Sequence, residues 1–170
     1  MPGPWKVYEE LHRYPVDEPE RVRLFAEALE CSVVWVGDDG WPMGVVHWFV
    51  WDGGKFFVTS GAERPRVEAL RARPESCVIV SSAGTGLGPA ISVSARTRAA
   101  VRDDSATRDW FAGALAAKAY PDQAALRTQF ERMLRETRRV VIELEPVRLV
   151  SYDGSKMAGA MHEAGLLGRD

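Results

Sequence analysis

The side chains best suited to chemistry in this sequence are two hydroxyls followed closely by two guanidinium groups. Thr59 and Ser60 end a predicted strand, and Arg64 and Arg66 stand at the start of a predicted short helix. The first N–H groups of a helix are free, its dipole favours negative charge, and guanidiniums bind phosphate in a fixed geometry. The four residues therefore predict a phosphate receptor. The alternative is a solvated basic helix, because two further arginines follow on the same segment.

Other catalytic patterns are missing from the sequence. The three histidines, His12, His47 and His162, are far apart and have no metal-ligand spacing, so no metal site is expected. No nucleophile elbow of the G-x-S-x-G type occurs, and no catalytic residue is assigned. The two cysteines, Cys31 and Cys77, form no C-x-x-C pair and are expected to be buried thiols in a reducing cytosol.

Length and charge limit the class of protein. The chain has 170 residues and a net charge of −2, which fits one globular domain and argues against nucleic-acid binding. The N-terminal residues have no apolar signal segment, and no run approaches the length of a membrane span. A cytoplasmic protein without nucleic-acid or membrane partners is expected.

Hydrophobic periodicity predicts mainly strands with flanking helices, an α+β class. We expect a lead-in over residues 1–18, one domain over 19–152, and a Gly/Ala-rich tail over 153–170 that is mobile or reaches a partner. Short turns and few crossovers favour a closed or nearly closed antiparallel barrel. The expected strands cover residues 32–36, 42–50, 55–60, 76–82, 89–101 and 140–152, and the expected helices cover 19–30, part of 61–74, 105–118 and 122–136.

Several motifs resemble the pyridoxamine 5′-phosphate oxidase-like family, in particular its actinobacterial branch, which includes deazaflavin-dependent enzymes. The resemblance spans about residues 20–156. Its main motif is the stretch from His47 to Ser60, with Trp48-Phe49 and Asp52-Gly53-Gly54 inside it, followed by Arg64-Pro65-Arg66 and Leu70-Arg71-Ala72-Arg73-Pro74. Weaker matches are Gly40-Trp41-Pro42, Lys118-Ala119-Tyr120 and Glu145-Pro146-Val147-Arg148.

The resemblance implies an FMN-binding-protein-like split β-barrel that forms a homodimer with cofactor sites at the subunit interface. It implies that Thr59, Ser60, Arg64 and Arg66 hold the cofactor phosphate. The second strand would line the ring, through residues among Val46, His47 and Trp48. The implied cofactor is FMN, with the deazaflavin coenzyme F420 and then haem as alternatives.

The sequence departs from the family pattern at three places. Arg66 stands where a lysine is usual, and Val46-His47 replaces a proline and an apolar neighbour. Ser94-Ala95-Arg96 replaces a glycine of the fifth strand. These changes leave the identity of the cofactor open.

Three functional hypotheses follow. The first is an FMN- or deazaflavin-dependent oxidoreductase that transfers hydride to or from a small organic substrate, with His47 near the ring or substrate. The second is a non-catalytic carrier or sensor of flavin or haem with the same fold. The third is an unrelated small barrel that binds an apolar ligand, with its arginines merely solvated.

Overall fold

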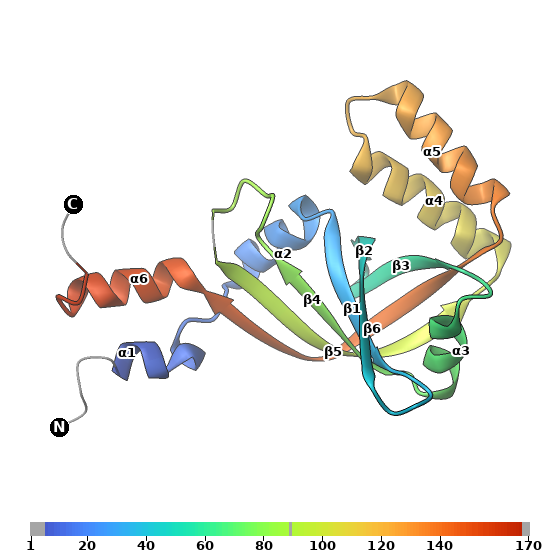
Figure 1. Ribbon diagram of the computed structural model, residues 1–170. Helices are drawn as coiled ribbons and strands as arrows, with labels where there is room; N and C mark the ends of the chain where they lie inside the picture. The colour runs from blue at the N-terminus through green and yellow to red at the C-terminus, as the bar shows by residue number, and fades with distance from the viewer. Residues whose placement is uncertain (1–5, 89, 168–170) are drawn as a thin grey trace. The chain divides into compact units, whose positions relative to one another are not determined.

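The computed structural model describes residues 6–88 and 90–167, and its strands form a closed antiparallel barrel (Figure 1). The predicted α+β split-barrel class is confirmed. Around the barrel the strand order is β1-β2-β3-β6-β5-β4. The strands are β1 (Glu30–Val36), β2 (Pro42–Asp52), β3 (Lys55–Gly61), β4 (Glu75–Ser81), β5 (Ile91–Arg102) and β6 (Arg139–Asp153).

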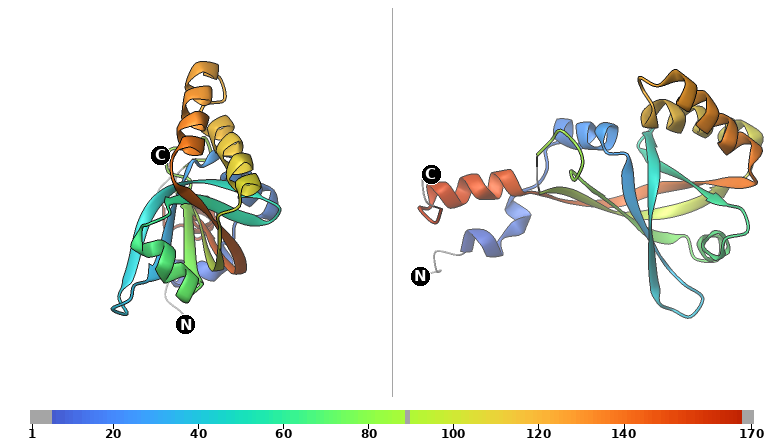
Figure 2. Two further views of the ribbon diagram at one scale, coloured as in Figure 1. Left: turned by 90° about the vertical axis from the view of Figure 1, so that its right-hand side faces the viewer. Right: turned by 45° about the horizontal axis from the view of Figure 1, so that its top comes forward.

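The helices follow the expected order, with one addition at each end of the chain. Figure 2 shows α4 and α5 lying side by side. The helices are α1 (Lys6–Glu9), α2 (Glu18–Glu27), α3 (Pro65–Ala72), α4 (Ser105–Ala119), α5 (Ala124–Glu136) and α6 (Gly154–Glu163), with a 3-10 turn at Leu11–Arg13.

The chain forms two compact units. One contains the described residues up to Ala28, those of Val80–Ser94 and those from Leu149 onward. The other comprises Leu29–Ile79 and Ala95–Arg148, and it contains every residue of the predicted phosphate receptor.

Alternating side chains explain why the strands form. In β1, Cys31, Val33 and Trp35 point inward and are buried, while the residues between them are more exposed. The turn between β2 and β3 has Gly53 and Gly54 at φ values of 53° and 81°. Two consecutive positive φ values belong to the tight turn that suits a twisted hairpin, and glycine adopts them without strain.

Helices α4 and α5 pack against the outside of the barrel. Phe111 and Leu115 of α4 and Leu134 of α5 form a buried cluster with Val50 of β2 and Val141 of β6. This cluster fixes the helix pair against the strands that carry the predicted site.

The two ends of the chain have more structure than the sequence suggested. Helix α6 lies in the predicted tail and is capped by Asp153, whose carboxylate accepts hydrogen bonds from the N–H groups of Ser155 and Lys156. Asp17 precedes the first residue of α2, but its side chain forms no cap on that helix. Asp17 instead forms an ion pair of 2.8 Å with Lys156.

Candidate functional site

The predicted site residues lie where β2 and β3 separate. These strands pair from Asp52↔Lys55 as far as Phe49↔Val58. Before Phe49, β2 continues along β1, and after Val58, β3 continues along β6. A cavity of about 260 Å³ opens at this separation. Its lining includes the predicted Val46, His47, Trp48 and Thr59, together with Leu115, Phe130, Met133, Leu134 and Arg139.

Ser60 is buried and holds one of the predicted arginines. The Arg66 guanidinium donates from Nε to Ser60 Oγ at 3.0 Å, and its carbon lies 5.8 Å from the centre of the Trp35 ring. Pro65 at the first position of α3 places Arg66 in the first turn of that helix. The hydroxyl predicted to bind a ligand therefore orients a cationic side chain.

Thr59 plays the same part for an arginine that the sequence analysis missed. Arg139 begins β6 and donates from Nε to Thr59 Oγ1 at 3.1 Å. The Thr59 hydroxyl donates its proton to the carbonyl oxygen of Val140 at 2.9 Å. Its oxygen is thus left to accept from Arg139.

Arg64, Arg66 and Arg139 concentrate positive charge at this end of β3. Burial and the charge of Arg64 lower the pKa of Arg66; burial, Arg66 and Arg64 lower the pKa of Arg139. Guanidiniums nevertheless remain protonated at neutral pH. The cluster is therefore positive and mutually repulsive.

Neighbouring arginines differ because they have acidic partners. Arg71 pairs with Glu68 at 2.7 Å, and Arg138 pairs with Glu63 at 2.5 Å. Within residues 6–88 and 90–167, no carboxylate lies at ion-pair distance from any of the three clustered arginines. An anion bound between them would relieve their repulsion.

Arg64 faces a second opening. It lines a cavity of about 380 Å³ with Gly61, Ala62, Glu63 and Arg138. Arg64 also forms the N-terminal boundary of α3, without a side-chain cap. Its charge still acts on Arg66 and Arg139.

His47 is neutral in this environment. Burial, then the charges of Arg66 and Arg139, lower its pKa to about 4, against a hydrogen bond with the Thr59 backbone that raises it. Its Nε2 atom is buried and has no hydrogen-bond partner among the described residues. A buried polar atom without a partner is costly, so Nε2 is suited to a ligand group.

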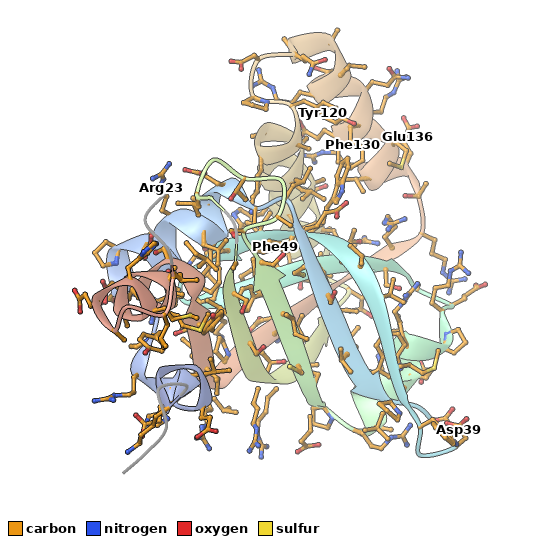
Figure 3. All side chains as sticks on the ribbon, turned by 60° about the vertical axis from the view of Figure 1, so that its left-hand side comes forward. Arg23, Asp39, Phe49, Tyr120, Phe130 and Glu136 are labelled. Atoms are coloured by element: carbon orange, nitrogen blue, oxygen red, sulfur yellow. The ribbon has the colours of Figure 1, made fainter. Side chains whose placement is uncertain are left out.

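Aromatic side chains form another part of the cavity lining, which includes Trp48 and Phe130. The centre of the Trp48 ring lies 5.6 Å from that of Phe130 and 6.3 Å from that of Tyr120. Figure 3 shows Tyr120 and Phe130 close together on the α4–α5 pair, and their ring centres are 5.6 Å apart. The site thus combines a cationic end with an aromatic wall.

In the described part of the chain, no three His, Cys, Asp or Glu side chains are grouped to hold an ion. Of the helices described, none is long and apolar enough to cross a membrane.

The fold and this cluster define an antiparallel split barrel with a cationic cavity where two strands separate. The profile described as pyridoxamine 5′-phosphate oxidase matches residues 18–151, and the chain belongs to that family. The family expected from the motifs is confirmed. Among curated proteins, none matches this chain.

Solved structures share the fold at low sequence identity. The conserved hypothetical protein Rv2991 of Mycobacterium tuberculosis has a TM-score of 0.70 at 16% identity, and 91% of each chain is covered. An F420 reductase has a TM-score of 0.52 at 18% identity, and the match covers 75% of this chain and 94% of the reductase chain. The haem storage protein HutZ of Vibrio cholerae has a TM-score of 0.57 at 15% identity, covering 79% and 94%.

Proposed function

We propose that this protein binds a flavin-type cofactor by its phosphate and acts as an oxidoreductase on a small organic molecule. The observation that carries the proposal is the cluster of Arg64, Arg66 and Arg139, which has no acidic partner in the described residues and adjoins the cavity. The cofactor is FMN, with the deazaflavin coenzyme F420 as the alternative. Family membership and the structural likeness to an F420 reductase support this assignment.

The described residues fit such a group. Arg66 and Arg139 are held by buried hydroxyls, so little side-chain freedom remains to be lost when they bind phosphate. Trp48 offers an apolar surface to a planar ring, and Val46 and His47 lie beside it on β2. His47 Nε2 can accept a hydrogen bond from a hydroxyl or N–H of the ligand.

The bound cofactor would supply hydride transfer, which needs no protein nucleophile. The chain's own residues bind the phosphate, orient the ring and keep water from one side of it. His47 is unsuited to donate a proton as an imidazolium at neutral pH, because its pKa is about 4. We assign it to ligand positioning.

Titration with FMN, F420 and riboflavin tests the proposal. Arg66→Ala and Arg139→Ala should each weaken FMN binding about 10- to 100-fold, the usual effect of losing a charge-assisted hydrogen bond. Riboflavin lacks the phosphate, so its weaker binding should not change. Arg71→Ala, which removes an ion-paired arginine of the same helix, is the matched control. Failure of wild-type protein to bind either phosphorylated cofactor would refute the proposal.

A second candidate is non-catalytic haem binding. The neutral, unpartnered His47 Nε2 is the form of imidazole that ligates iron, and the haem storage protein HutZ shares the fold. Haem binding should give a Soret band that is lost in His47→Ala and kept in His12→Ala. A Soret band that persists in His47→Ala would rule out His47 as the ligand of the haem iron.

We propose that two copies associate through the outer face of β1, β2 and β4. Val46 and Ile79 flank Ser32 in the strand register and are exposed by 57% and 39%, and Val36 is exposed by 41%. Exposed apolar surface of this kind commonly marks an interface. Val46 also lines the cavity, so such a dimer would bring the partner close to the cofactor.

We also propose a cytoplasmic location. Cys31 and Cys77 are both unpaired thiols. Free thiols persist in a reducing compartment, whereas disulfides form in oxidising ones.

A further inference from the structure

Another cavity lies between the end of α4 and helix α5, beside the cavity at the separation of β2 and β3. It has a volume of about 220 Å³ and is lined by Tyr120, Leu126, Gln129, Phe130 and Met133. Phe130 and Met133 also line the cavity at the separation of β2 and β3. The two cavities therefore share a wall.

The lining of this cavity, which we call the α5 cavity, contains no charged side chain. Tyr120 and Phe130 provide aromatic surface, and Met133 provides a flexible, polarisable contact. Gln129 provides an amide that can both donate and accept a hydrogen bond. An uncharged aromatic molecule with one polar group matches this chemistry better than an anion does.

Exposure and size support a ligand in this place. Leu126 is exposed by 44% and Met133 by 41%, so apolar area faces solvent at the rim. A cavity of about 150 Å³ is known to bind benzene. The larger α5 cavity has room for one or two fused rings.

Position relates this cavity to the phosphate-binding cluster. Trp48 lines the cavity at the separation of β2 and β3, and it packs against both Phe130 and Tyr120 of the α5 cavity. A ring lying along Trp48 would therefore be next to an occupant of the α5 cavity. Arg139, the member of the arginine cluster that lines the cavity at the separation of β2 and β3, does not line the α5 cavity.

We propose that the α5 cavity binds the organic substrate, and that this substrate is an uncharged molecule of one or two aromatic rings. The assignment as a substrate site rests on the proposed flavin-type cofactor. The proposed affinity of the α5 cavity for aromatic molecules does not depend on that cofactor.

Prodan tests the proposal directly. It is an uncharged naphthalene ketone whose emission shifts to the blue in apolar surroundings, and its affinity for the full chain can be measured by equilibrium dialysis. Leu126→Asp places a charge at the rim and should weaken binding at least about tenfold. Ala125→Asp makes the same change on the neighbouring exposed residue of α5, which does not line the cavity, and should leave binding unchanged.

Saturating FMN tests the relation to the cofactor. FMN should quench prodan emission by energy transfer without altering the dissociation constant of prodan. Arg66→Ala, which should weaken FMN binding, should leave the affinity for prodan unchanged.

Three results would overturn the inference. They are no prodan binding by wild-type protein, equal binding by Leu126→Asp and Ala125→Asp, and competitive displacement of prodan by FMN. If neither FMN nor F420 binds but prodan binding still depends on Leu126, the proposed function fails while the aromatic-binding cavity is supported.

Discussion

Arg139 of β6 and Thr59 of β3 are joined by a hydrogen bond of 3.1 Å from the guanidinium Nε to the hydroxyl Oγ1. The bond is directional because the Thr59 proton is already used on the carbonyl of Val140. Since β3 and β6 are paired at this point, the barrel itself fixes Arg139 at the separation of β2 and β3. The strand that carries the predicted hydroxyls therefore also positions a cation from a distant part of the chain.

Thr59→Val should weaken FMN binding by about 2- to 10-fold, because Arg139 loses the acceptor that orients it. The side chains have the same shape, so packing is retained, and loss of the bond to Val140 should cost about 1 kcal/mol of stability. Thr59→Ser keeps the hydroxyl and should bind FMN as wild type does. Titration of the three proteins measures the effect; equal affinities would show that Arg139 needs no such support.

Stability should fall as pH is lowered from about 6.5 towards 4. His47 has a pKa of about 4 in the folded protein, against 6.5 for the free side chain, so the unfolded chain binds its proton first. The contribution of His47 to the free energy of unfolding is fully present above pH 6.5, and it decreases as the pH falls from about 6.5 to about 4. The pKa difference corresponds to about 3 kcal/mol as an upper magnitude.

Urea unfolding of wild type and His47→Gln across this range measures the contribution of His47. The variant should lose less stability than wild type over the window, because it lacks the titrating ring. Parallel curves would contradict the assigned environment of His47. The same comparison with His162→Gln controls for a histidine of the other unit.

The two thiols should differ in reactivity. Burial raises the pKa of Cys31 to about 12, and burial also raises that of the less buried Cys77. The thiolate is the reactive form, so Cys31 should resist iodoacetamide in the folded protein. Mass spectrometry should find Cys77 labelled first and both labelled in denaturant. Faster labelling of Cys31 would contradict its buried position.

Short-range patterns gave the sequence analysis its successes. The turn at Gly53-Gly54, the strand that ends at Thr59 and Ser60, and the proline that begins α3 are all local signals. They were enough to place Arg66 near Ser60. The predicted roles of the hydroxyls as cofactor ligands remain predictions, and the structure shows them holding arginines.

Long-range pairing explains what the sequence analysis missed. Arg139 follows Thr59 by 80 residues, and nothing local shows that β6 pairs with β3. Phe130 and Met133 lie on the helix predicted over 122–136, but which side of the barrel this helix covers depends on tertiary packing, which the sequence pattern does not show. One local feature of the sequence indicates the start of helix α6, namely Asp153 as a helix cap before Ser155. The surrounding segment is rich in glycine and favours no regular structure.

Ile79→Lys should separate the proposed dimer. Ile79 is 39% exposed on the outer face of β4, and a lysine there would place a charge within the apolar contact. Leu126→Lys is the control, because Leu126 is similarly exposed but lies on α5, outside the three strands of the proposed interface.

Sedimentation equilibrium should give wild type and the control about twice the chain mass of 18.9 kDa, and Ile79→Lys a single chain mass. FMN affinity should fall together with dimerisation, because Val46 belongs both to the exposed face and to the cavity lining. A monomeric wild-type protein that binds FMN would show that one chain suffices for the site. A dimeric Ile79→Lys variant would instead show that association uses another face.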